Sequence, residues 1–232
     1  MTQTGVVARL ALRELWISFR LFAVIVGFVA AGAIVALVPE PLPQLMERLA
    51  LGFGVASLVA AVVAAWSIAD ERRLGRAGWL VSRSVPRRTL FLGWFLAVSG
   101  VALAALVPAT MIGWLAATNV TLGLDAGGYL ARMLAVAGTA MAAVAIGSVA
   151  GTLLGPRVAA LVTVAVLLWL ATIAWVGPVD SSVVPGGAFG ELAALREPGS
   201  GTASGLRGAG VALATTAVVL IIGLAAIERA DL

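Results

Sequence analysis

The sequence contains no cysteine, no histidine and no lysine. Without cysteine it has no disulfide, no thiolate nucleophile and no thiolate-bound zinc or iron–sulfur cluster. Without histidine it lacks the commonest general base and the commonest ligand of transition metals. Without lysine it cannot form a Schiff base or supply the lysine with which a P-loop holds nucleotide phosphates. The chain is therefore expected to bind no cofactor and to hydrolyse no ATP by itself.

Charged residues are also scarce. They make up 11% of the 232 residues, whereas apolar residues make up 62%. A soluble domain has about 25% charged and about 45–50% apolar residues, and a chain of this size has too little interior to hide the excess. The composition predicts an integral membrane protein and excludes a soluble enzyme. All fifteen basic residues are arginine and the formal charge is +4, which on a membrane protein indicates topology, so no nucleic-acid partner is expected.

Six apolar runs are long enough to cross about 30 Å of hydrocarbon as helices. Strand-like alternation is absent, and backbone in a membrane must satisfy its own hydrogen bonds, so an all-α fold is expected. Residues 1–232 then form a single polytopic domain. Pro108 predicts tilt or a kink in the third span, and Arg132 is expected to extend from the fourth span to the headgroups. The spans are predicted at residues 21–38, 49–69, 91–117, 129–154, 158–176 and 209–227.

Arginine is distributed unevenly between the two sides that these spans define. Eleven arginines fall on one side and four on the other, and the positive side of a membrane protein is cytoplasmic. Both termini are therefore expected inside. The Ala-, Gly- and Arg-rich composition points to a GC-rich bacterial genome, and so to the bacterial cytoplasmic membrane. The eleven are Arg9, Arg13, Arg20, Arg72, Arg73, Arg76, Arg83, Arg87, Arg88, Arg157 and Arg229; the four are Arg48, Arg132, Arg196 and Arg207.

Residues 5–20 have an amphipathic pattern ahead of the first span. Arg9, Arg13 and Arg20 fall on one stripe of a helical wheel. We expect a helix in the membrane interface, with Trp16 at the headgroups and the arginines toward anionic lipid. The alternative is a cytoplasmic extension of the span, whose apolar run is too long for a cleaved signal peptide. The apolar face consists of Ala8, Leu12, Leu15, Trp16 and Phe19.

The segment between the second and third spans, residues 68–94, carries six of the arginines but also keeps apolar residues. A plain solvated loop has no need of a run such as Trp79-Leu80-Val81. The pattern favours a short amphipathic helix that lies on the membrane surface or docks into a partner. The alternative is a positively charged anchor with no further role.

This segment resembles the cytoplasmic loop of ABC-2-type transporter permeases. Its features follow in the family's order. They are an acidic-basic cluster with a glycine, then an apolar turn, then a basic closing turn with a second glycine. Ser84 and Pro86 stand exchanged relative to the family pattern, and Trp94 stands where lysine is usual. The matching residues are Asp70-Glu71-Arg72, Gly75, Trp79-Leu80-Val81, Arg87-Arg88-Thr89-Leu90 and Gly93.

The resemblance extends to the order of elements: an N-terminal interfacial helix, six spans, and an external segment at 177–208. It implies that residues 70–88 form a coupling helix seated in a cytoplasmic P-loop ATPase, present in two copies that bind ATP and magnesium. It also implies a second permease subunit, identical or paralogous, and export of a cargo. The expected coupling residues are Asp70, Glu71, Arg72, Gly75, Trp79, Leu80, Arg83, Arg87 and Arg88.

Two other function classes compete with the transporter. An integral membrane enzyme lacks a catalytic constellation, because the adjacent Asp70 and Glu71 point about 100° apart on a helix. A non-transporting module, such as an assembly factor or a sensor anchor, remains the alternative. For a transporter, spans rich in apolar and small hydroxyl residues favour a hydrophobic or amphipathic cargo. The hydroxyl residues are Ser57, Thr110, Ser148, Thr163, Thr172 and Thr215.

A ladder of small residues with a spacing of four lies toward the end of the fourth span. Small side chains at i, i+4 let two helix backbones approach closely. Packing inside one subunit is the first expectation, and contact between two subunits is the alternative. The ladder consists of Ala143, Gly147, Gly151 and Gly155.

Overall fold

The computed structural model describes residues 3–37, 42–76, 80, 85–120, 125–176 and 202–229. All regular structure in these ranges is α-helical and no strand occurs in them, so the all-α prediction is confirmed there. The helices are α1 (Gln3–Ile17), α2 (Arg20–Leu37), α3 (Leu42–Arg73), α5 (Arg87–Val120), α6 (Ala126–Leu153), α7 (Pro156–Val176) and α9 (Thr202–Arg229).

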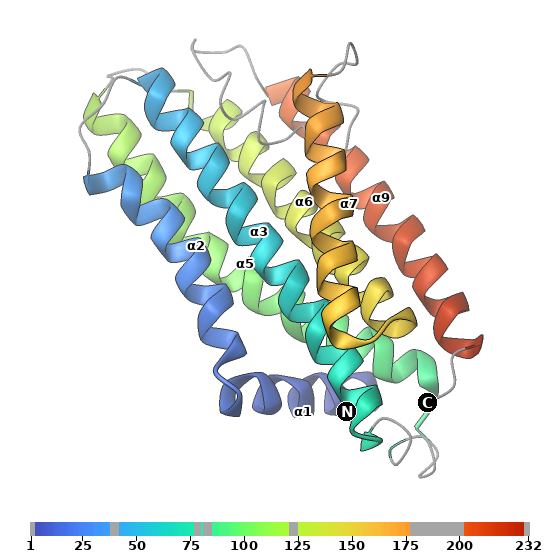
Figure 1. Ribbon diagram of the computed structural model, residues 1–232. Coiled ribbons are helices and arrows are strands. Elements are labelled where there is room, and N and C mark those ends of the chain that lie inside the picture. The colour runs from blue at the N-terminus through green and yellow to red at the C-terminus, as the bar shows by residue number, and fades with distance from the viewer. Residues whose placement is uncertain are drawn as a thin grey trace.

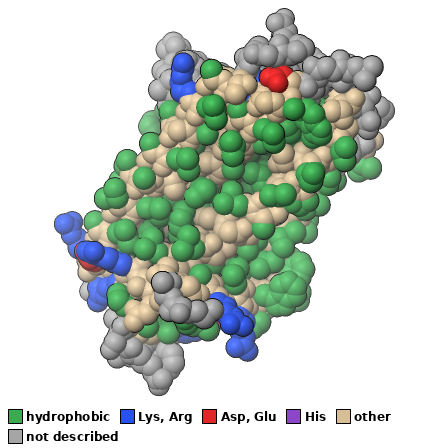
Figure 2. Space-filling view, turned by 180° about the vertical axis from the view of Figure 1, so that it is seen from behind, with side chains coloured by type: hydrophobic (Ala, Val, Ile, Leu, Met, Phe, Trp, Pro, Cys, Tyr) green, Lys and Arg blue, Asp and Glu red, His purple; other side chains and the backbone are tan. Residues whose placement is uncertain are grey.

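Five of these helices, α3, α5, α6, α7 and α9, are long and apolar enough to cross a membrane. A sixth crossing comes only from α1 and α2 taken together, and their axes are bent by 81° at the break between them. The belt between the two ends of the molecule is apolar or uncharged in Figure 2, and charged side chains lie toward the ends. A membrane-embedded protein is therefore supported, and the predicted first span at 21–38 corresponds to α2.

Most helices extend beyond the predicted spans. The second prediction, 49–69, lies inside α3, and the third, 91–117, lies inside α5. The last, 209–227, lies inside α9. Hydropathy detects only the part of a helix that is apolar, whereas backbone hydrogen bonding carries the helix on into polar turns. α5 also continues through Pro108 as one helix.

The long helices lie side by side, with α1 across their lower end, where α9 also finishes (Figure 1). α6 is the most enclosed element, because it packs against α3, α5, α7 and α9. α7 and α9 are far more exposed. Exposed apolar helix surface in this belt must face lipid or another membrane subunit, so α7 and α9 are expected at the outer boundary of the bundle.

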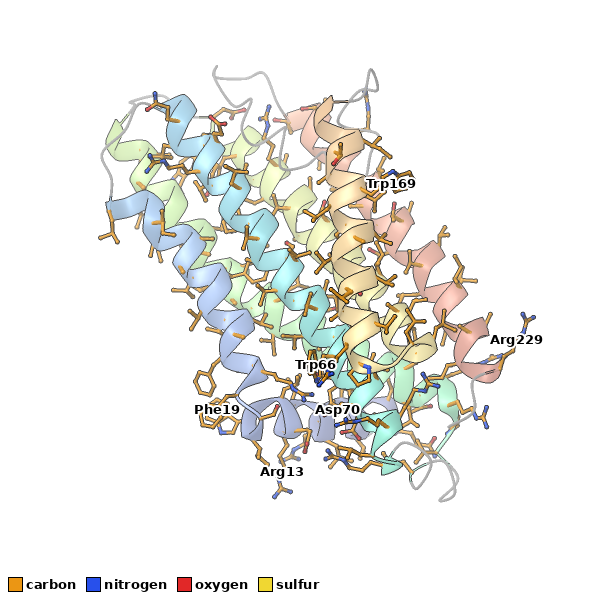
Figure 3. The ribbon with its side chains drawn as sticks, in the orientation of Figure 1. Arg13, Phe19, Trp66, Asp70, Trp169 and Arg229 are labelled. Atoms are coloured by element: carbon orange, nitrogen blue, oxygen red, sulfur yellow. The ribbon has the colours of Figure 1, made fainter. Side chains whose placement is uncertain are left out.

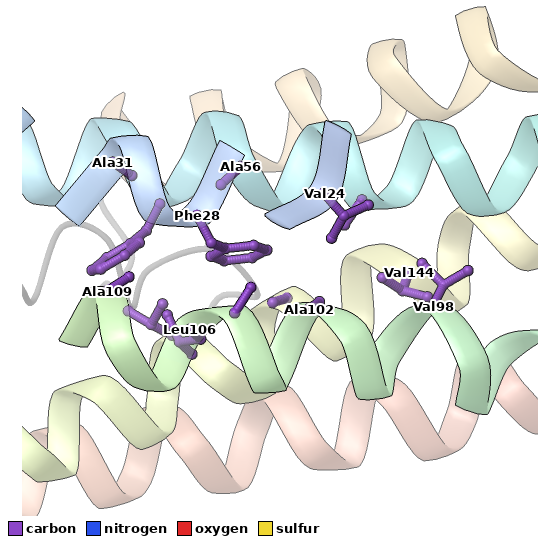
Figure 4. Close-up of a cluster of buried hydrophobic side chains, with 14 of the residues drawn as sticks. Val24, Phe28, Ala31, Ala56, Val98, Ala102, Leu106, Ala109 and Val144 are labelled. Atoms are coloured by element: carbon purple, nitrogen blue, oxygen red, sulfur yellow. The ribbon is translucent and has the colours of Figure 1, made fainter. Parts of the chain in front are cut away.

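The core between α2, α3, α5 and α6 alternates large and small side chains (Figure 4). Phe28 and Phe53 are fully buried, with ring centroids 6.4 Å apart. Beside them Gly32 meets the backbone of Ala109 so closely that a Cβ atom would stand 2.8 Å from its carbonyl oxygen. Helices in a membrane associate by such close van der Waals packing, since lipid supplies no hydrophobic contrast.

Arg132 does not behave as predicted. Its exposure is 3%, so it does not extend to the headgroups but stays inside the bundle. Asp125 caps the start of α6 by accepting from the backbone N–H groups of Gly127 and Gly128, at 3.1 Å and 2.9 Å. The absence of a side chain at Gly128 leaves the Arg132 guanidinium close to that capped turn. The chain position of Arg132 near a helix start did not reveal which face of α6 is covered.

Candidate coupling site at the arginine-rich end

Ten of the fifteen arginines lie at the lower end of the bundle in Figures 1 and 3, which we call the arginine-rich end. Three others lie at the opposite end, and Arg83 and Arg196 lie outside the described residues. The unequal distribution used for the topology prediction is thus present in three dimensions. The ten are Arg9, Arg13, Arg20, Arg72, Arg73, Arg76, Arg87, Arg88, Arg157 and Arg229.

The helix α1 lies across this end, and the turn that separates it from α2 has a local cause. Ser18 donates its hydroxyl to the carbonyl of Glu14 at 2.8 Å, and Phe19 adopts a left-handed backbone with φ 59°. Such a conformation ends a right-handed helix. The predicted helix 5–20 therefore ends at Ile17, and Arg20 begins α2 instead.

The face that α1 turns toward the bundle is Val7, Ala11 and Leu15, which lie four residues apart and are buried. Of the predicted apolar face only Leu15 belongs to this set. Trp16 is 58% exposed and Phe19 is 73% exposed. The helix thus has two apolar sides: one packs against α5 and α2, and the other is exposed.

The uncovered side is an aromatic cluster at the bend. Trp16 and Phe22 have ring centroids 5.0 Å apart, and Phe19 and Phe22 have centroids 5.7 Å apart. Arg9 and Arg13 are exposed on the same helix. Exposed aromatic and arginine side chains next to an apolar belt suit the headgroup layer, so the expectation that α1 lies at the interface stands as a prediction.

Arg20 points into the protein instead of toward lipid. Its guanidinium donates to the Asp70 carboxylate at 2.9 Å and to the Ser67 hydroxyl at 3.3 Å. Arg73 donates to the other carboxylate oxygen of Asp70 at 3.0 Å. The side chain of Asp70 is only 16% exposed, so two arginines compensate a largely covered charge. The pairing fixes the start of α2 to the end of α3.

A second link joins α1 to the turn that follows α3. Arg76 donates to the Glu14 carboxylate at 2.7 Å and approaches the Glu71 carboxylate at 3.5 Å. The hydrogen bond with Glu14 stabilises the guanidinium and raises the pKa of Arg76 above its ordinary value. The turn itself uses Gly75 with φ +70°, a conformation that favours glycine.

The predicted coupling residues do not lie on one element. Asp70, Glu71 and Arg72 form the last turn of α3, and Arg87 and Arg88 open α5. Leu80 is partly buried and packs with Val7, Val85 and Leu90. Part of the Leu80 side chain is therefore covered by this chain itself. Residues 77–79 and 81–84, which would form the centre of a coupling helix, lie outside the described residues. Trp79 and Arg83 are among them.

The start of α5 is joined to the end of α9. Arg87 donates to the backbone carbonyl of Glu228 at 3.1 Å, and Arg88 forms a short ion pair with the Glu228 carboxylate. Arg72 reaches the carbonyl of Gly151 on α6 at 3.5 Å. The two helices that flank residues 74–86 are therefore tied to α1, α2, α6 and α9 around this end.

Most of the hydroxyl residues expected along a cargo path donate a hydrogen bond to the backbone of their own helix. Ser148 and Thr163 are buried, and each donates to the carbonyl four residues earlier, at 2.8 Å and 2.7 Å. Thr172 and Thr215 do the same at 2.8 Å and 2.9 Å. A hydroxyl that donates to its own backbone has no donor left for a cargo and can only accept, so these residues give no direct support to a polar path within one chain.

The small-residue ladder meets α3 within the same chain. A Cβ atom on Gly147 would stand 2.1 Å from the carbonyl oxygen of Ala61, and one on Gly151 would stand 2.5 Å from that of Ala65. Ala143 is buried, whereas Gly155 lies beyond α6 with nothing within 4 Å of its Cβ position. Close approach of α6 and α3 thus uses the two central glycines.

Among the described residues, no group of three or more acidic, His or Cys side chains is placed to hold a metal ion. No model of a known protein family matches this chain, and no curated protein sequence matches it either. Sequence reasoning also missed the two links Arg20–Asp70 and Arg76–Glu14. The signal for them was present, because opposite charges stand in segments that the predicted topology places on one side of the membrane.

Proposed function

We propose that this chain is the membrane-spanning permease subunit of an ATP-driven exporter of the ABC-2 kind, energised by a separate ATPase subunit. A homodimer or a pair of related permeases would then form with two ATPase copies. The proposal rests on the loop that resembles the family and on the order of the elements. The cargo class that suits so apolar a chain is hydrophobic or amphipathic.

The observation that carries the proposal is the network of contacts at the arginine-rich end. Residues 74–86 are bounded directly by α3 and α5, and ion pairs connect those helices to α1, α2 and α9. A partner that pushed on this segment would act on the ends of two long helices at once. Nucleotide-driven closure of a partner could therefore shift the balance between two arrangements of the bundle.

The bend between α1 and α2 also supports the proposal. The helix α1 lies across the end, packs on α5 through a buried stripe, and is ion-paired to the turn after α3. It therefore lies beside the start of α5 and the turn after α3, the two described parts that flank the proposed docking segment. A plain extension of α2 would instead project away from the bundle and leave this end open.

The deciding experiment is gentle affinity purification of the full chain from its native membrane, followed by mass spectrometry. We expect a P-loop ATPase to co-purify at close to a one-to-one ratio, together with a second permease if the two permeases differ. Recovery of the chain alone, or with a partner that is not an ATPase, would contradict the proposal and favour a non-transporting membrane module.

A further inference from the structure

A pocket opens at the arginine-rich end between α3 and the beginning of α7. Its cavity volume is about 430 Å³, within the range of small-molecule sites. Trp66, Asp70 and Arg73 line it from α3, and Arg157 and Val158 line it from α7. Figure 3 places Trp66 and Asp70 beside the lower end of α7.

The charge around this pocket is strongly positive. Both oxygens of Asp70 are already occupied, one by Arg20 and the other by Arg73. Arg157 makes no hydrogen bond or ion pair with the part of the chain that the structure describes, and it is exposed. Two arginines, Arg73 and Arg157, and one carboxylate therefore line the pocket, and Arg20 pairs with that same carboxylate. The charge of Arg157 lacks a counter-anion within the described residues.

The pocket also has an apolar side that continues toward the membrane centre. Trp66 is 39% exposed, Val158 is 52% exposed, and Leu161 one turn further along α7 is 70% exposed. The apolar part of α3 ends where Asp70 and Arg73 begin. Tryptophan and arginine at such a boundary lie at the depth of lipid headgroups.

We propose that this pocket binds the phosphate headgroup of an anionic phospholipid from the adjacent leaflet, with its acyl chains along α7. Arg157 and Arg73 hold the phosphate, and Trp66 lies against the glycerol region. A free anion would gain nothing from the apolar side, which is why a lipid fits better than inorganic phosphate. Asp70, which lines the pocket, is also among the expected coupling residues. The two proposals are still tested separately, because lipid preference is measured without an ATPase partner.

The test uses the full chain in phosphatidylcholine vesicles with a minor fraction of brominated lipid, which quenches nearby tryptophan. The contribution of Trp66 is obtained by comparison with Trp66→Phe. Trp169, which is 64% exposed and lies toward the other end of α7, supplies an internal control through Trp169→Phe. Brominated phosphatidylglycerol and brominated phosphatidylcholine are compared at equal fractions.

We expect phosphatidylglycerol to be preferred at Trp66 by about fivefold for each arginine that holds it, with no preference at Trp169. Arg157→Gln should reduce the preference about fivefold. Arg229→Gln is the matched control, because it removes an exposed arginine of the same end outside the pocket, and it should leave the preference unchanged.

Equal preference at both tryptophans, or an unchanged preference in Arg157→Gln, would overturn the site in favour of general surface attraction. Loss of the preference on adding inorganic phosphate would also overturn it, because the pocket would then take a free anion. If Arg157→Gln fails to fold, the comparison of Trp66 with Trp169 through the two Phe variants, with Arg157 kept, still decides. None of these outcomes depends on whether an ATPase partner exists.

Discussion

At the scale of single residues, the arginines of this chain divide into two kinds. Some hold the fold together, as Arg20 does through Asp70 and as Arg76 does through Glu14. Others, such as Arg9 and Arg157, have no ion-pair partner among the described residues and are available to the surroundings. Sequence position alone did not separate the two kinds: it placed Arg9 and Arg20 together on one stripe facing anionic lipid, whereas only Arg20 has an ion-pair partner among the described residues. Each kind predicts a different effect of substitution.

The Asp70 carboxylate predicts a loss of stability when it is neutralised. Asp70→Asn should lower the free energy of unfolding by about 2 kcal/mol, because charged hydrogen bonds to Arg20 and Arg73 are weakened where the carboxylate is largely covered. Arg73→Gln is the control, since its side chain is 67% exposed and its pair should contribute under about 1 kcal/mol. Thermal unfolding of the purified chain in detergent measures both, and equal shifts would contradict the assignment.

The Arg88–Glu228 pair allows coupling to be separated from stability. Arg88→Gln and Glu228→Gln break the same ion pair, but only Arg88 belongs to the residues proposed to contact the ATPase. Arg88→Gln should leave insertion intact yet uncouple ATP hydrolysis from transport, whereas Glu228→Gln should transport normally. The measurement is cargo-stimulated ATPase activity of the reconstituted complex. An equal loss in both variants would mean that the ion pair matters and the loop contact does not.

At the scale of elements, helix contacts set by glycine determine how the bundle packs. α6 approaches α3 through Gly147 and Gly151, and α2 approaches α5 through Gly32. At the same time, α1 is bent by 81° from α2 by a left-handed residue and not by proline or glycine. Phe19 in that conformation is strained by about 1–2 kcal/mol, and its packing against Phe22 helps to maintain it.

The close packing of α6 on α3 predicts that adding a methyl group at Gly147 lowers the stability of the chain. Gly147→Ala should destabilise the chain by about 1–3 kcal/mol, because its Cβ would meet the Ala61 carbonyl and force the helices apart. Gly100→Ala in α5 is the control, since nothing lies within 4 Å of that Cβ position. It should be neutral or slightly stabilising. Thermal unfolding distinguishes the two, and similar values would show that α6 and α3 are not in close contact.

At the scale of the whole molecule, charge and apolar surface are segregated along one axis. The arginine-rich end carries α1, the ends of α3 and α9 and the starts of α5 and α7. On the face shown in Figure 2, the belt between the ends is apolar or uncharged. This arrangement places residues 3 and 229 at the same end, in agreement with an even number of crossings if α2 also spans.

The expected orientation can be tested because the chain has no cysteine. Thr202 is exposed at the end opposite the arginine-rich end. Thr202→Cys should therefore react with a membrane-impermeant thiol reagent applied to intact cells. Gln3→Cys, exposed on α1, should react only after the membrane is opened. The reverse pattern would place the arginine-rich end outside and would exclude contact with a cytoplasmic ATPase.

Much of the architecture could be predicted from the sequence because it depends on local runs. The length of each apolar run located six helices to within a few residues at most ends, and the arginine count marked one end of the bundle. The start of α3 at Leu42 and of α9 at Thr202 fell outside the predictions by seven residues each, counted from 49 and 209. Those turns are polar or glycine-rich, so hydropathy does not include them.

Composition and the length of the apolar runs thus predicted the kind of protein: helical, membrane-embedded and positively charged at one end, because these properties do not depend on which helices become neighbours. The tertiary structure alone decided that Arg20 binds Asp70, that Arg132 is buried, and that α1 buries Val7 and Ala11 instead of Trp16. Each of these outcomes depends on which helices become neighbours. A helical wheel describes the faces of one helix, whereas the covered face is chosen by packing between helices far apart in the chain.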